Sequence, residues 1–248
     1  LLGWGAEDGK TETFTLCELT RAFSLERVTA SPAIFDFDKL KWLNRRYIKQ
    51  ADPERIAKLA ERQFCLHRPD IFPLWSSSEL YTAEMLTFLA QQDPPIHLDV
   101  PSIELINLRK AWFARLLAIF LPAVDHLDQF PVRSDFIFGF DPSAARLNRE
   151  NAAILNADSA RTVLSELAGR VRTHSHYVTL EDFKAWMNEI KNAAGVEGKE
   201  LFQPARIAIT GSHSGPEFDK LLPLIEDGAA LGLPIPGVRD RLEQFVGV

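Results

Sequence analysis

Apolar residues in this chain recur at intervals of three and four between clear helix signals, and this spacing limits the fold more than any other feature. The longest example opens at Pro101-Ser102. An apolar face with this period belongs to a helix packed on a core. Its expected buried stripe consists of Leu105, Leu108, Trp112, Leu116 and Ile119, widened by Ile106, Phe113 and Phe120.

Similar signals predict four further helices between residues 77 and 195. Ser76 and Glu79 form a capping-box pair that opens a helix over about 77–91. Thr179 and Asp182 cap another, which Gly195 closes. The other two are expected over about 148–155 and 159–171, the latter with Val163, Leu164, Leu167 and Val171 facing inward.

Extended structure has little room in this pattern. The short apolar runs 136–140 and 207–209 are the two places where a strand remains an alternative. We therefore predict a mainly α fold.

The composition fits a globular protein without a membrane span. The 248 residues are 46% hydrophobic and 25% charged, enough for one large domain or two to three small ones. Apolar runs such as 116–121 are too short to cross a bilayer. Cys17 and Cys65 lack metal-site spacing, so buried free thiols are expected.

A basic segment near the N-terminus suggests a contact with phosphates, although the net charge of the chain is −6. Asp36 and Asp38 precede it, as at the start of a helix. Leu40, Leu43 and Tyr47 then form an apolar stripe, with Ile48 at its edge. The opposite line, roughly 12 Å long at helical rise, carries Lys41, Arg45 and Lys49, with Arg46 beside it. A solvated basic face is the alternative explanation.

The segment 201–218 combines one arginine with a turn of small residues. Its sequence is L-F-Q-P-A-R-I-A-I-T-G-S-H-S-G-P-E-F. Bare backbone, hydroxyls, a guanidinium and a ring are the groups that hold unstacked bases and their phosphates. Turn chemistry alone also explains the glycines and the proline, so a structural role is the alternative.

Two segments together resemble the C-terminal half of the bacterial glutamyl-tRNA synthetase family. The first, residues 23–48, reads F-S-L-E-R-V-T-A-S-P-A-I-F-D-F-D-K-L-K-W-L-N-R-R-Y-I, and the second is 201–218. The opening L-L-G-W-G is also similar to the family, whereas the likeness is thin over 60–180. The resemblance implies a stem-contact fold over 1–60 and an all-α anticodon-binding domain of two helical subdomains, 61–136 and 137–248.

The resemblance also implies which residues touch tRNA. Lys41, Arg45, Arg46 and Lys49 would contact its stem, although the family often has glycine at the position of Arg45. The residues implied at the anticodon are Arg206, Thr210, Gly211, Ser212, Gly215, Pro216 and Phe218. Phe218 has a second interpretation, as the first core residue of a helix over 217–226. On the base-contact reading, Arg206→Ala weakens tRNA binding and leaves thermal stability nearly unchanged.

The family's catalytic signatures are not found in this sequence. Neither an H-I-G-H-like motif nor a K-M-S-K-S-like loop occurs, so no catalytic residue and no metal ligand is predicted here. ATP and Mg²⁺ are implied for a catalytic half outside this chain, and the 248 residues alone are expected to be inactive. The resemblance further implies a cytoplasmic monomer that binds tRNA rather than DNA.

One departure from the family bears on which tRNA is selected. Some members that charge only the glutamate tRNA carry an arginine directly before a segment that here reads V-D-H-L-D-Q-F, residues 124–130, where this chain has Ala123. A relaxed enzyme that also charges the glutamine tRNA is therefore an open alternative.

Two other classes of function are alternatives to a synthetase portion. A metal site at His174, His176, Glu181 and Asp182 is disfavoured, because histidines two positions apart point away from each other on a helix. A freestanding helical module that binds tRNA or a protein, without catalytic activity, remains the alternative to a synthetase portion.

Overall fold

The computed structural model describes residues 3–9, 11, 13–29, 34–68, 102–174 and 177–247. All regular elements in these ranges are helices, and a single isolated bridge joins Trp4 to Val28. The mainly α prediction is confirmed for this part of the chain. The helix expected over 77–91 lies outside the described residues.

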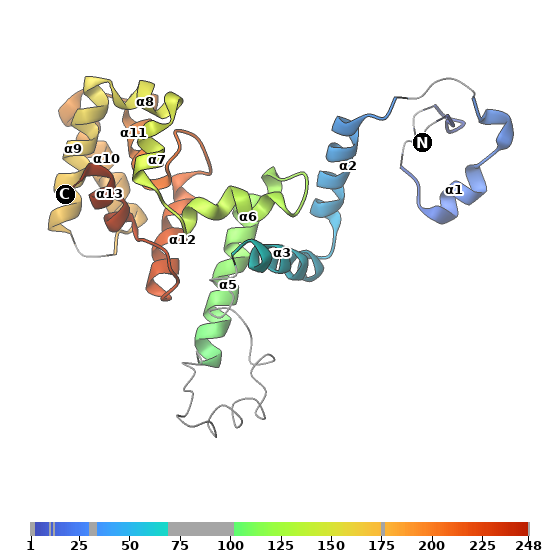
Figure 1. The fold of residues 1–248 in the computed structure, drawn as a ribbon, viewed down its shortest axis with the longest axis horizontal. Coiled ribbons are helices and arrows are strands. Elements are labelled where there is room, and N and C mark those ends of the chain that lie inside the picture. Colours follow the sequence, from blue (N-terminus) through green and yellow to red (C-terminus); the bar gives the residue numbers. More distant parts are fainter. Residues whose placement is uncertain are drawn as a thin grey trace.

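Within each described range the helices follow one another with short connections (Figure 1). The α-helices are α1 (Leu16–Ala22), α2 (Phe37–Gln50), α3 (Pro53–His67), α5 (Ile103–Phe120), α6 (Gln129–Ser134), α7 (Pro142–Leu147), α8 (Arg149–Leu155), α9 (Asp158–Thr173), α10 (Leu180–Ala194), α11 (Lys199–Thr210), α12 (Phe218–Ala230) and α13 (Val238–Val246). Three short 3-10 helices, η1 (Leu25–Arg27), η3 (Leu121–Ala123) and η4 (Asp135–Ile137), connect them.

Several helix ends form where the caps were predicted. Thr179 and Asp182 make a reciprocal capping box at the start of α10, and Gly195 ends that helix with φ +66°. Ser102 accepts a hydrogen bond from the Leu105 amide at the start of α5. These side chains satisfy backbone groups that have no partner within the helix, so the local sequence determines the ends.

Two buried residues of α5, Arg109 and Leu117, were not in the predicted stripe. Of the predicted residues, Leu105 and Ile119 are only half-buried. Leu108 is 50% exposed, whereas Arg109 is 6% exposed and sits in the stripe. The guanidinium of Arg109 donates to the Leu231 carbonyl at the end of α12 from two of its nitrogens, at 3.2 and 3.0 Å. A charged head that finds a carbonyl can be buried, and hydrophobic periodicity does not reveal such a partner.

The same face of α5 packs on α12 through Trp112. Its indole Nε1 donates to the Leu224 carbonyl at 2.7 Å. Gly228 lies against the ring, and a Cβ there would stand 2.9 Å from Nε1 and 2.6 Å from a methyl of Ile235. The glycine therefore allows the two helices to approach closely.

The two runs that left room for strands are helical or irregular. Residues 207–209 lie inside α11, and all three side chains are fully buried. Helix α11 packs against α9, α10, α13 and α8, so it is apolar around most of its circumference. Residues 136–140 begin in η4 and continue as turn and coil. Both runs are apolar because the surrounding helices bury them, not because apolar and polar residues alternate as in a strand.

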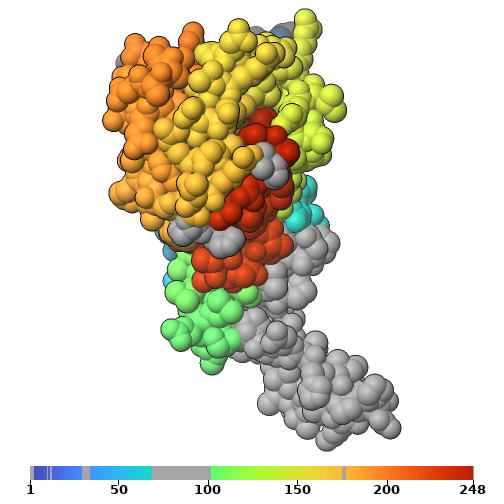
Figure 2. All heavy atoms as spheres, turned by 90° about the vertical axis from the view of Figure 1, so that its left-hand side faces the viewer, coloured from blue at the N-terminus to red at the C-terminus, as the bar shows by residue number. Residues whose placement is uncertain are grey.

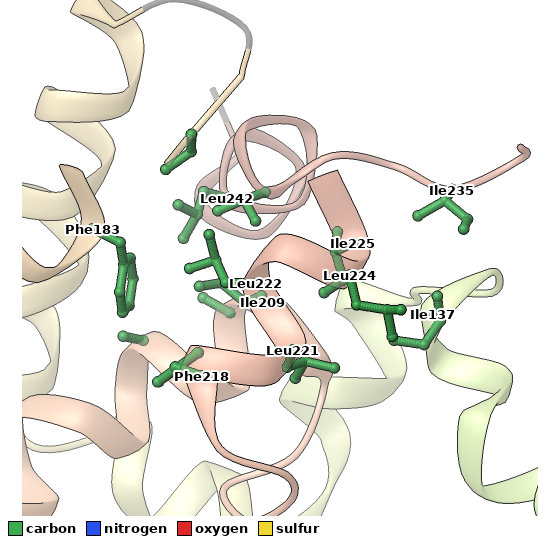
Figure 3. Packing of buried hydrophobic residues seen from close by; sticks show 14 of the residues in the cluster. Ile137, Phe183, Ile209, Phe218, Leu221, Leu222, Leu224, Ile225, Ile235 and Leu242 are labelled. Carbon is green, nitrogen blue, oxygen red and sulfur yellow. The ribbon is translucent and has the colours of Figure 1, made fainter. Parts of the chain in front are cut away.

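One hydrophobic cluster joins the helices from α3 to α13. It runs from Ala60 and Phe64 to Leu242 and Phe245 and takes residues from both predicted helical subdomains. Figure 3 shows its centre, where Phe183 of α10 faces Phe218 of α12, and the centroids of the two rings are 4.8 Å apart. In the space-filling view the C-terminal helices form one compact body, from which the start of α5 projects (Figure 2).

Two buried charges brace this body. Arg241 of α13 is fully buried, and its guanidinium donates to the carbonyls of Phe136, Ile137, Ile209 and Pro236. Burial lowers the pKa of Arg241 to about 9, which leaves it charged at neutral pH. Its positive charge thus ties η4, the end of α11 and the start of α13 together.

The second buried charge is Glu226 of α12, which is 3% exposed. Its carboxylate accepts from the amides of Val238 at 2.7 Å and Val178 at 3.2 Å. Burial raises the pKa of this carboxyl. The carboxylate fixes the starts of α10 and α13 relative to α12.

The N-terminal segment, by contrast, has few buried side chains. No residue of α1 or α2 is buried, and in Figure 1 these helices extend away from the rest. Leu40 and Tyr47, expected to form an apolar stripe, are 43% and 57% exposed. Cys17 is exposed and Cys65 only partly buried, so the expectation of two buried thiols is wrong for Cys17.

Replacing Arg241 should destabilise the fold strongly. We expect Arg241→Met to lower the free energy of unfolding by about 3 kcal/mol or more, because several buried carbonyls lose their donor at about 1–3 kcal/mol each. Urea denaturation of the chain measures this loss. Arg161→Ala, at an exposed arginine of α9, serves as the control and should change the value by less than about 0.5 kcal/mol. Equal losses in the two variants would contradict the bracing role.

Candidate nucleic-acid interface

The segment 201–218 folds as most of α11, a loop over 211–217 and the first residue of α12. Gly211 ends α11 in the left-handed conformation, with φ +79°, and its amide donates to the Ile207 carbonyl. The buried amide of Asn151 donates to the Gly211 carbonyl at 2.8 Å. A non-glycine residue would be strained at this φ, so turn geometry accounts for Gly211.

Thr210 also serves the loop itself. Its hydroxyl lies 2.8 Å from the Arg206 carbonyl and 3.0 Å from the Ser212 carbonyl, and it accepts from the Ser212 amide. The side chain is 5% exposed. Its hydroxyl is therefore hydrogen-bonded within the protein and helps to shape the loop.

Arg206 holds the far end of the loop. It lies in α11, where its guanidinium donates to the Pro216 carbonyl and stands 4.3 Å from the centroid of the Phe218 ring. Gly215, with φ +154°, passes close to the same guanidinium. Partial burial lowers the pKa of Arg206. The predicted base-contacting arginine thus has internal partners that its sequence position did not reveal.

Phe218 is a core residue in this structure. It is 8% exposed, and its ring contacts the guanidinium of Arg206 and the ring of Phe183. Of the two interpretations of Phe218 that the sequence left open, the burial agrees with the one that makes it the first core residue of its helix.

The predicted anticodon residues border two separate hollows, each of about 650 Å³. We call them the loop hollow and the helix hollow. Arg206 and Phe218 face the helix hollow, between α10, α11 and α12. The loop hollow is lined by Thr210, Ser212, Ser214, Gly215, Pro216, Glu217 and Lys220 on one side and by Ala118, Ile119, Phe120, Pro122, Ala123, Arg133 and Phe136 on the other. Gly211 borders neither.

The two sides of the loop hollow differ in chemistry. The side from α5 to η4 is apolar apart from Arg133. The opposite side offers hydroxyls and bare backbone, and within the described residues the Gly215 amide donates to no acceptor. An apolar wall that faces a few polar groups is the usual build of a pocket for a small planar ligand. The sequence had indicated only the polar side.

Ala123 stands in the apolar side of this hollow. In the family that the sequence resembles, some members carry an arginine at this position. The structure therefore brings the two sequence signals, Ala123 and the loop, to the same hollow although they are far apart in the chain. Arg133 and Lys220 were missed, because no motif marks them.

The basic line on α2 is less free than the sequence suggested. Asp125, distant in sequence, accepts from Arg45 Nε at 2.7 Å and from a second nitrogen of the same guanidinium. Lys41 lies 3.3 Å from Asp38, with both side chains exposed. The guanidinium of Arg46 lies 5.8 Å from the centre of the Trp42 ring. Of the four predicted stem contacts, Arg46 and Lys49 have no ion-pair partner among the described residues.

Arg45 belongs to a junction with the segment after η3. Beside it, Asn44 Nδ2 donates to the Asp125 carbonyl at 2.6 Å and lies 3.0 Å from His126 Nδ1. Asp125 follows Ala123 by two residues. This junction, formed by Asn44, Arg45, Asp125 and His126, therefore connects α2 to a wall of the loop hollow.

Comparison with known proteins identifies the family. The sequence pattern described as the anticodon binding domain matches residues 82–231, which include both sides of the loop hollow. This chain belongs to the anticodon binding domain family. The match ends before α13 and begins after α2, so Arg241 and the basic line lie outside it.

The similar curated proteins are glutamate–tRNA ligases. Those from Natranaerobius thermophilus and Desulforamulus reducens are 30% and 29% identical over 225 residues, which is 91% of this chain and 39% of each relative. The chain thus spans about two fifths of their length. It corresponds to their anticodon-binding region.

Solved structures agree on the fold. A glutamate–tRNA ligase from Elizabethkingia meningosepticum matches the whole chain with a TM-score of 0.57 at 15% identity, and one from Elizabethkingia anophelis with 0.54 at 15%. Each match covers 39% of the solved chain. At this identity the likeness concerns the fold alone.

Replacing Arg206 should affect stability, contrary to the expectation from sequence. Arg206→Ala removes the bond to Pro216 and the contact with Phe218, so we expect a loss of about 1–3 kcal/mol in the free energy of unfolding. Lys184→Ala is the control, since Lys184 borders the same hollow but forms an exposed pair with Asp219 worth about 1 kcal/mol at most. An unchanged unfolding midpoint for Arg206→Ala would show that these contacts contribute nothing.

The junction at Asp125 should give a measurable coupling energy. In a double-mutant cycle of Arg45→Ala and Asp125→Ala we expect about 0.5–1 kcal/mol, since two nitrogens of one guanidinium bond to a partly buried carboxylate. The matched cycle of Lys41→Ala and Asp38→Ala, an exposed pair one helical turn apart, should give about 0.3 kcal/mol. Independent effects of Arg45 and Asp125 would mean that Arg45 is free in solution.

Proposed function

We propose that this chain is the tRNA-binding portion of a glutamate–tRNA ligase. Its loop hollow would receive a base of the anticodon, and α2 would lie along the stem. The observation that carries the proposal is the loop hollow itself, which falls within the family match and joins an apolar wall to a loop of hydroxyls and backbone amides. The names of the curated relatives supply the amino acid.

Each side of the loop hollow has a task in binding an unstacked base. The faces of a base are apolar and its edges carry hydrogen-bonding groups, so a flat apolar wall can cover a face while polar groups meet an edge. Phe136 and Pro122 supply apolar wall, and Ser212, Ser214 and the Gly215 backbone supply polar groups opposite. Thr210, Gly211 and Arg206 support the loop that carries them.

The remaining basic groups of α2 suit phosphates. Lys41, Arg46 and Lys49 lie on exposed positions of one helix, and long flexible side chains with a positive charge can reach phosphates. In this proposal Arg45 acts mainly through Asp125, which holds α2 in place, rather than as a direct stem contact.

Catalysis would lie outside this chain. A glutamate–tRNA ligase attaches glutamate to tRNA with the help of ATP, and the residues that hold ATP and Mg²⁺ would belong to another part of that enzyme. This chain would choose the tRNA and orient it, as a cytoplasmic monomer. The 248 residues alone are therefore expected not to charge tRNA.

A freestanding binding module remains the second candidate, because the chain spans only 39% of the curated relatives it matches. Whether the reading frame continues upstream with a catalytic domain distinguishes the two. Charging of tRNA by the 248 residues alone would contradict both.

Binding to tRNA should depend on both salt and anticodon. We expect the chain to bind glutamate tRNA with an affinity that falls steeply with salt, and to bind a tRNA with a scrambled anticodon more weakly. Filter binding at two salt concentrations measures both effects. Lys41→Ala and Lys49→Ala should weaken binding of all tRNAs and lower the salt slope by about one each.

Arg161→Ala provides the control for these variants, because Arg161 lies on α9, at the opposite end of the molecule from α2 (Figure 1). It should leave both the affinity and the salt slope unchanged. Equal binding of the native and scrambled anticodons would refute anticodon recognition, and the absence of any binding would refute the proposal as a whole.

A further inference from the structure

The loop hollow contains one cation whose charge no acid balances. Three charged side chains border it, and two of them, Lys220 and Glu217, lie 3.3 Å apart as a pair. Arg133 is the third. Among the residues that the structure describes, its guanidinium has no hydrogen bond, ion pair or ring contact. Its donors are therefore available to a molecule that enters the hollow.

The backbone that carries Arg133 is firmly anchored. Helix α6 buries Phe130, Pro131 and Ser134, and the Ser134 hydroxyl donates to the Phe130 carbonyl at 2.9 Å. Ser134 is fully buried and adjoins η4, whose Phe136 and Ile137 carbonyls accept from Arg241. The backbone at Arg133 is therefore already in place before a ligand enters the hollow.

The surroundings of Arg133 favour a base edge over a phosphate. On its own side of the hollow the neighbours are apolar, including Pro122, Ala123 and Phe136. A phosphate gains nothing from an apolar wall, whereas the face of a base does. Ala123 is small and adds no polar group, so Arg133 is the polar group on that side.

We propose that Arg133 determines specificity by donating to the acceptor edge of the anticodon base held in the loop hollow. This inference rests on the proposed function, because it requires that the hollow receives an anticodon base. A guanidinium offers a planar fork of donors and selects bases that present matching acceptors on their edge. From α6, the Arg133 side chain would donate the hydrogen bonds to the base that Ala123 of η3 cannot donate.

The test is a binding matrix of four proteins against glutamate tRNA and variants that differ at single anticodon positions. The proteins are the wild-type chain, Arg133→Ala, Arg133→Lys and the control Arg161→Ala. We expect Arg133→Ala to reduce discrimination at one anticodon position by about 5- to 150-fold and to leave the other positions unchanged. Arg133→Lys keeps the charge but loses the fork, so it should retain the salt slope and still lose discrimination.

Three results would overturn the inference while leaving the proposed function intact. Uniform weakening of all tRNAs by Arg133→Ala, with a salt slope lowered by about one, would assign Arg133 to a phosphate. Unchanged discrimination in Arg133→Ala would remove it from the interface. Full discrimination in Arg133→Lys would show that charge alone suffices.

Failure of the proposed function gives a different result. The wild-type chain itself would then bind all anticodon variants equally, or bind no tRNA. Arg133 is exposed, so its variants should unfold at the same urea concentration as the wild-type chain, which separates a loss of recognition from a loss of folding.

Discussion

The guanidinium of Arg241, which does not line the loop hollow, bonds to the backbone of both segments that form its sides. One of its acceptors is the carbonyl of Phe136, whose side chain stands in the apolar wall. Another is the carbonyl of Ile209, the residue before Thr210 and the loop. A buried charge bonded to carbonyls of separate segments fixes their distance, because moving either segment would strand the charge or a carbonyl without a partner. The width of the hollow therefore depends on a residue of α13 that does not border it.

In the 201–218 segment some residues stabilise the loop, and others are left to contact a ligand. The guanidinium of Arg206 bonds to the Pro216 carbonyl, and the Thr210 hydroxyl bonds to the Ser212 carbonyl. The Gly211 amide donates to the Ile207 carbonyl at the end of α11. This leaves the backbone and hydroxyls beyond Ser212 as the surface that the loop presents. A rigid support behind an exposed loop is how a protein positions hydrogen-bonding groups without ordering them at the moment of binding.

The junction around Asp125 links the two regions proposed to meet tRNA. Asn44 and Arg45 of α2 bond to residues that follow Ala123 by two and three positions. Few other side chains hold α2, since none of its own is buried. The orientation of its basic face relative to the loop hollow thus depends on a small set of polar contacts.

Local signals in the sequence determined the helices, because caps such as Thr179 with Asp182 and terminators such as Gly195 and Gly211 act within a few residues. The sequence motifs also indicated the family and one side of the interface. Only the tertiary structure decided that Arg206 supports the loop, that Arg45 is paired with Asp125, and that Arg133 and Ala123 face Gly215. The physical reason is that a charged side chain takes its role from its partner, and these partners lie 10 to 80 residues away in the chain.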